Sequence, residues 1–124
     1  MTAPTEDLIT ALRAVQAASP GVSAVVLSSV EGRILGSTAL TGLEKLRISA
    51  VSAASLAIAR KGMRELQLGD VRRVHIKGDS GSILLVGVGQ TALLTLVIAG
   101  EVDMDRLLWD IRKTTERLEA LVPH

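Results

Sequence analysis

The sequence predicts a single α+β domain in which helices accompany a mostly antiparallel sheet, and three observations support this prediction. Five short apolar or alternating segments occur along the 124 residues. Most of them are joined by connections of hairpin length, which pair strands antiparallel. Three segments with helical periodicity occupy the two ends and the middle of the chain. The resulting order, α-β-β-α-β-β-β-α, fills residues 1–124 without a linker and is typical of the α+β class.

The chain opens with a predicted helix followed by a hairpin. The helix is expected over residues 5–18, with Thr5 as its N-cap and a stripe of leucine and valine along one side. The β-branched, apolar segment 22–29 predicts a largely buried strand. A Glu-Gly pair then supplies a turn, and residues 33–38 return as the second arm of the hairpin.

The next segment, residues 41–68, predicts one long helix around which the rest of the chain is organised. Thr41 and Glu44 match the capping box, in which a hydroxyl and a carboxylate each accept a hydrogen bond from a backbone N–H at the helix start. Gly69 is the expected terminator, because glycine readily adopts the left-handed conformation that ends many helices.

Two apolar faces of different character run along this long helix. The bulky face, expected to pack on the sheet, consists of Ile48, Val51, Leu56, Ile58, Ala59, Met63 and Leu66. The opposite face consists of Leu43, Leu46, Ala50, Ala53, Ala54 and Ala57, followed by Lys61 and Arg64. A surface helix normally has one apolar stripe and a polar back. A helix that is apolar on two sides needs cover on both, and we predict that a second copy of the chain supplies it; the alternative is a monomer whose first and last helices do so.

Three more strands and a helix complete the prediction. The segment 71–77 alternates, with two β-branched residues on one side and Arg73, His75 and Lys77 on the other, which is typical of a charged edge strand. Strands follow at residues 82–88 and 91–99, separated by tight turns. The last helix is expected to begin after its N-cap, Asp103, and to turn Leu107, Ile111, Leu118 and Leu121 toward the core.

Composition argues against catalysis, metal binding and nucleic-acid binding. The chain has no cysteine, and its two histidines, His75 and His124, do not form a cluster with metal-ligand spacing. The net charge is +1, and the single aromatic residue leaves no stacking platform for bases. No secretory signal or segment long enough to span a membrane is recognisable. We therefore expect a cytoplasmic protein that has no catalytic residues, cofactor or metal and does not insert into membranes.

Three features that resemble functional motifs have simpler interpretations. Residues 87–91 resemble a fragment of a phosphate-binding loop, but the Gly-Lys-Ser/Thr ending is missing and a strand follows, so a β-turn is predicted. The basic cluster of residues 60, 61, 64, 72 and 73 is interpreted as a solvated rim or a rim for an acidic protein partner. Trp109 is expected to be a core or half-buried residue, with an interface anchor as the alternative.

With these elements in place, residues 8–118 resemble the Roadblock/dynein light chain family, and within it the bacterial members related to MglB. The resemblance rests on Gly21 to Leu27 with Glu31-Gly32-Arg33, on the alanine-rich helix after Thr41, on Gly69-Asp70-Val71 leading into Val74-His75-Ile76, on Gly78 to Val86, and on Ala92 to Ile98. Family members usually have an aspartate where this chain has Glu31.

The resemblance implies a Roadblock/profilin-like fold with a five-stranded antiparallel sheet of order 2-1-5-4-3 between one long helix and two terminal helices. It also implies a homodimer whose long helices pack side by side and whose third strands join. The predicted dimer interface comprises Leu46, Ala50, Ala53, Ala54, Ala57, Val71, Arg73, His75 and Lys77.

The function implied by the resemblance is that of a non-enzymatic adaptor or regulator in bacterial signalling. Its partners would be a second copy of the chain and a Ras-like small GTPase, in some bacteria alongside a sensor kinase. The predicted partner-binding residues are Arg60, Lys61 and Arg64. The alternatives are a small-ligand sensory domain, which the aliphatic core filler argues against, and a scaffold subunit of another complex.

Overall fold

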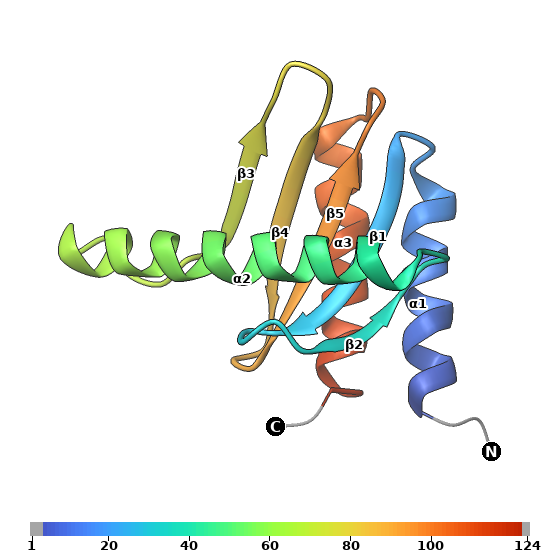
Figure 1. Ribbon diagram of the computed structural model, residues 1–124, viewed down its shortest axis with the longest axis horizontal. Helices are drawn as coiled ribbons and strands as arrows, with labels where there is room; N and C mark the ends of the chain where they lie inside the picture. The colour runs from blue at the N-terminus through green and yellow to red at the C-terminus, as the bar shows by residue number, and fades with distance from the viewer. Residues whose placement is uncertain (1–3, 123–124) are drawn as a thin grey trace.

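The computed structural model describes residues 4–122 and contains, within them, the predicted order of three helices and five strands (Figure 1). The elements are α1 (Pro4–Ala18), β1 (Val22–Ser29), β2 (Ile34–Ser37), α2 (Gly42–Glu65), β3 (Arg73–Lys77), β4 (Ser82–Val88), β5 (Ala92–Ile98) and α3 (Met104–Glu119). His124 lies outside the described residues.

The five strands form one antiparallel sheet in the order β2-β1-β5-β4-β3, as the family resemblance implied. The predicted bounds of β1 and β4 are confirmed, whereas β2, β3 and β5 are shorter than their hydrophobic segments. Residues 71 and 72, predicted as strand, precede β3 because pairing with β4 begins only where Arg73 lies opposite Val86. The edge strands are therefore β2 and β3, and β3 exposes its outer edge.

The main core lies between the sheet and the two terminal helices, which cover the same face (Figure 1). Leu12 of α1, Leu94 and Leu96 of β5, and Leu107 and Leu118 of α3 are all fully buried there. Asp103 caps α3 as predicted, because its carboxylate accepts a hydrogen bond from the backbone N–H of Arg106 at 3.2 Å. The helix α1 begins at Pro4, so Thr5 lies within its first turn and not at the N-cap position.

The opposite face of the sheet carries α2 alone, which runs across the strands (Figure 1). This contradicts the interpretation in which the first and last helices cover α2 within a monomer. The capping box at its start is confirmed: Glu44 N–H donates to Thr41 Oγ1, and Thr41 N–H donates to Glu44 Oε1, both at 3.1 Å.

The predicted terminator of α2 is wrong by two residues. Gln67 adopts the left-handed conformation, with φ of 55°, and donates its N–H to the carbonyl of Arg64 at 3.1 Å. The N–H of Leu68 reaches back to the carbonyl of Met63 at 2.9 Å. This pair of bonds is a Schellman motif, which ends the helix before Gly69.

A small, partly polar contact joins α2 to the sheet. Leu56 packs with Leu85 of β4 and Leu93 of β5 in a minor apolar cluster. Ser52 is fully buried, and its hydroxyl accepts a hydrogen bond from Thr95 Oγ1 at 2.7 Å. Small side chains let the helix lie close to the strands, so α2 buries little bulky apolar surface against its own sheet.

Candidate protein-interaction surface

Of the bulky side chains predicted to fill the space between α2 and the sheet, Leu56 does so, whereas three others point elsewhere. Val51 is 52% exposed, Ile58 75% and Leu66 70%, so this part of the prediction is wrong. The residues turned toward the sheet include Ser49 and Ser52, which are short and therefore carried no apolar signal in the sequence.

The residues predicted to pair helices occupy two different environments. Leu46, Ala50, Ala54 and Ala57 are exposed along the outward side of α2. Ala53 is half-buried beneath the β1–β2 turn, where a Cβ on Gly32 would lie 3.5 Å from the Cβ of Ala53. Ala53 thus packs against its own subunit, whereas the other four are open to a partner.

An apolar groove runs beside α2 over the part of the sheet that the helix leaves bare. Its floor is a row of cross-strand neighbours, Ile76 of β3, Ile83 of β4 and Val97 of β5. Ile76 is 46% exposed, and Ile83 and Val97 are half-buried. Val51 of α2 borders a cavity of about 160 Å³ that Ile83 and Val97 also line. This apolar groove (Ile76, Ile83, Val97 and Val51) is a surface that the chain itself does not cover.

The outer edge of β3 adjoins the apolar groove. Arg73, His75 and Lys77 are exposed and, as predicted, share one side of the strand, because they lie opposite Val86, Leu84 and Ser82 of β4. That side is the one on which α3 lies, away from α2. Val71 is half-buried and belongs to the segment that leads into β3.

The C-terminal part of α2 extends past β3, beyond the edge of its own sheet (Figure 1). Leu66 and Leu68, at this end, are largely exposed. A helix that leaves its sheet here carries apolar side chains to a place where only another molecule can cover them.

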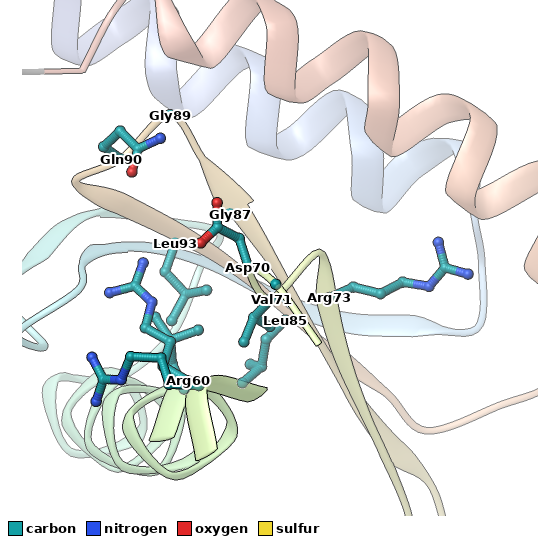
Figure 2. A pocket seen from close by; sticks show the side chains of 12 residues that line it. Arg60, Asp70, Val71, Arg73, Leu85, Gly87, Gly89, Gln90 and Leu93 are labelled. Carbon is teal, nitrogen blue, oxygen red and sulfur yellow. The ribbon is translucent and has the colours of Figure 1, made fainter. Parts of the chain in front are cut away.

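A second pocket, on the other side of α2 from the apolar groove, is lined by basic side chains (Figure 2). Arg60 and Arg64 contribute from α2, Gly87 from the end of β4, and Gly89 and Gln90 from the β4–β5 turn, around a volume of about 330 Å³. We call it the arginine pocket. Lys61 is exposed but does not line the arginine pocket.

The cations of these surfaces have no acidic partner among residues 4–122. The one ion pair within that range joins Arg106 and Asp110 on α3, at 3.8 Å. Nor do these residues include a group of three or more potential metal ligands, or a helix long and apolar enough to cross a membrane.

Trp109 differs from its predicted environment. It is 55% exposed on α3, and Lys113 Nζ lies 5.1 Å from the centre of its ring, within cation–π distance. The helical spacing alone could have predicted this exposure. Leu107 and Ile111 are four residues apart and share the buried face of α3, whereas Trp109, two residues from each, lies on the opposite side.

The sequence profile of the Roadblock/LC7 domain matches residues 9–98, which is most of the chain and includes β1 to β5 and α2. The chain belongs to the Roadblock/LC7 family. No protein with a curated description matches this Roadblock chain by sequence.

Solved structures agree with this assignment. A Roadblock/LC7 domain from Streptomyces avermitilis superposes with a TM-score of 0.85 at 19% identity, over 90% of this chain and 94% of that one. MglB from Myxococcus xanthus has a TM-score of 0.84 at 13% identity, over 100% and 96% of the two chains. An MglB described as having a tetrameric arrangement has a TM-score of 0.86 at 17% identity, over 98% and 91%. At these low sequence identities, the structural similarity shows a shared fold.

Proposed function

We propose that this Roadblock protein is a non-enzymatic, cytoplasmic adaptor that acts as a homodimer and binds a Ras-like small GTPase. Membership of the Roadblock/LC7 family and the likeness to MglB support the class of function. The observation that carries the proposal is the pair of uncovered apolar surfaces on α2 and on the sheet beside it, which together exceed what one subunit can bury.

The geometry supports a two-fold arrangement in which β3 of each subunit joins the other. A two-fold axis perpendicular to the sheet, at the outer edge of β3, turns the overhanging end of each α2 over the sheet of the other subunit. There it can lie along the apolar groove, which is open on the side of α2 that faces Ile76, Ile83 and Val97. One self-complementary surface would then cover both the overhang and the groove.

This arrangement changes which helix residues we expect at the interface. Val51 borders the groove, and Ile58 lies on the same side of α2 because it follows Val51 by seven residues, about two helical turns. We propose that these two residues face the second helix. Leu46, Ala50 and Ala57 lie toward the outer side and would form, with their counterparts, a platform of small apolar side chains.

The platform is the surface that we propose for the GTPase. Its middle consists of exposed apolar side chains, and Arg60, Lys61 and Arg64 add unpaired positive charge at one end. An apolar centre with a charged rim is the arrangement found at interfaces between proteins that also exist apart. A sensor kinase as a further partner stays a prediction from the family resemblance.

The oligomeric state is tested by light scattering on the full chain over a range of concentrations. We expect a particle of twice the 13.0 kDa chain mass for the wild type and for Leu43→Glu, and a monomer for Ile58→Glu. The side chains of Leu43 and Ile58 are both largely exposed, so a glutamate at either position does not disturb the core of the subunit. A wild type that stays at 13.0 kDa at high concentration would exclude the dimer.

The partner is tested by calorimetric titration with Ras-like GTPases encoded near the gene, each loaded with GDP or with a GTP analogue. Binding that differs between the two nucleotide states would support a regulatory role, and equal binding a scaffolding one. The absence of binding in both states would count against the adaptor function.

A further inference from the structure

The arginine pocket contains a glycine for which the fold gives no reason. Gly87 lies inside β4, where glycine weakens a strand and usually marks a bulge, a close backbone approach or a ligand. The pairing with β5 is regular on both sides of it, since Val86, Gly87 and Val88 lie opposite Leu94, Leu93 and Ala92. A Cβ at Gly87 would meet a single atom within 4 Å, the carbonyl oxygen of Gly89 at 3.9 Å. Neither a bulge nor a close approach within the subunit therefore accounts for Gly87, which leaves open space over this part of the strand.

The space that Gly87 leaves open lies beside two positive side chains. Arg60 and Arg64 are four residues apart on α2, so they project from the same side of the helix. Neither has a carboxylate within 4.0 Å among residues 4–122, and Leu56, Leu85 and Leu93 line the apolar part of the pocket. Arginine forks of this kind match the geometry of carboxylate and phosphate.

The remaining charges in the pocket do not cancel this pair. Figure 2 shows the carboxylate of Asp70 on the wall opposite Arg60, pointing toward Gly87. The side chain of Arg73 points away from the pocket, toward the other side of the sheet (Figure 2). Two guanidinium groups and one carboxylate thus share the pocket, which leaves it one positive charge in excess.

We propose that the arginine pocket binds an oxyanion, a carboxylate or phosphate group on a small apolar stem, held by Arg60 and Arg64 and seated over Gly87. The anion comes either from a free small molecule or from an acidic side chain of the protein partner. The pocket of about 330 Å³ is at the lower end of the range for small-ligand sites. The inference goes beyond the proposed adaptor function, because the first source does not require a GTPase.

The free-anion source is tested by NMR titration of the full chain with inorganic phosphate and, separately, with succinate, in a buffer free of other oxyanions. We expect saturable shifts of backbone amides confined to residues 60, 64 and 87–93. Gly87→Val should abolish them by occupying the space over the strand without changing charge, and Arg60→Glu by reversing one charge. Asp70→Asn should tighten binding, because it removes a negative charge of the pocket that repels the anion. The control is Arg13→Glu, which reverses one charge at an exposed position of α1, away from the pocket, and should leave the titration unchanged.

The protein source is tested by measuring the affinity of the same variants for the GTPase that binds the wild type. A loss of about tenfold or more for both Gly87→Val and Arg60→Glu, in the absence of shifts with phosphate or succinate, would assign the anion to the partner. Shifts with the small anions support the inference even if no GTPase binds, in which case only the adaptor function fails. No saturable shift, together with wild-type partner affinity in both variants or no partner at all, would overturn the inference.

Discussion

Thr95 Oγ1 donates a hydrogen bond to Ser52 Oγ at 2.7 Å, and this contact ties the middle of α2 to the middle strand of the sheet. Ser52 in turn donates to the carbonyl oxygen of Ile48 at 2.6 Å. Both side chains are at least 99% buried, so neither hydroxyl can exchange its partner for water. The link helps to fix the position of α2 along the sheet, together with the small apolar cluster around Leu56 and the contact of Ala53 with the β1–β2 turn.

Replacement of Thr95 by valine is expected to lower the free energy of unfolding by about 1 kcal/mol, because it keeps the side-chain shape and removes the donated hydrogen bond. Ser52→Ala is expected to cost more, since it leaves the buried Thr95 hydroxyl without its acceptor. Urea unfolding at a fixed protein concentration measures both. The double variant should lose less than the sum of the two single losses, and simple additivity would show that the bond contributes nothing.

The capping box at the start of α2 predicts a loss of about 1 kcal/mol for Thr41→Ala, because Glu44 N–H loses its acceptor. Thermal unfolding of this variant against the wild type measures it. A matched control is Thr10→Ala, an exposed threonine in the middle of α1, which should have little effect. An equal loss in both variants would argue against the cap.

Glu44 also predicts a pH dependence of stability. The backbone N–H of Thr41 and, secondarily, its side chain hold the pKa of the Glu44 carboxyl below its usual value. A carboxyl whose pKa is lower in the folded state stabilises the fold above its unfolded pKa, and this contribution disappears as the pH falls through the folded pKa. Glu44→Gln should therefore be less stable than the wild type at neutral pH and equally stable in strong acid. A difference that does not change with pH would contradict this assignment.

Two glycines predict opposite effects of the same substitution. A Cβ on Gly81 would lie 2.5 Å from the carbonyl oxygen of Ile98, so Gly81→Ala must displace backbone and is expected to cost roughly 1–3 kcal/mol. Gly62 lies inside α2 with nothing within 4 Å of such a Cβ. Gly62→Ala should therefore stabilise the subunit by about 1 kcal/mol through helix propensity. Equilibrium unfolding compares the two, and stabilisation by both would mean that the β3–β4 turn is free to shift.

The two faces of the sheet are expected to differ in their response to the loss of a leucine. Leu12→Ala opens a cavity in the main core and should cost about 3 kcal/mol. Leu56→Ala acts on the minor cluster beneath α2 and should cost less, while amide hydrogen exchange in α2 accelerates more than in α1 or α3. Equal costs, with uniform acceleration across all three helices, would show that α2 is as firmly held as the terminal helices.

Local sequence signals determined most of the secondary structure. The β-branched segment of β1, the capping box of Thr41 and Glu44, and the Asp103 cap depend on neighbours within a few residues, so they could be predicted from the sequence. The order of strands came from the family resemblance, because hairpin signals alone do not say which edges meet. The end of α2 was mispredicted because Gln67, and not a glycine, adopts the left-handed conformation there.

Only the tertiary structure determined which side chains of α2 face the sheet and which face away from it. Hydrophobicity assigned Val51 and Ile58 to the sheet, but a helix that crosses a sheet closely needs short side chains at the contact, and Ser52 meets that need through its bond to Thr95. The arginine pocket was equally hidden, because Arg60 and Gly87 come from different elements and meet only when the β4–β5 hairpin folds beside the helix. Periodicity shows that a helix has two apolar sides, whereas packing distances determine which side its own sheet can accept.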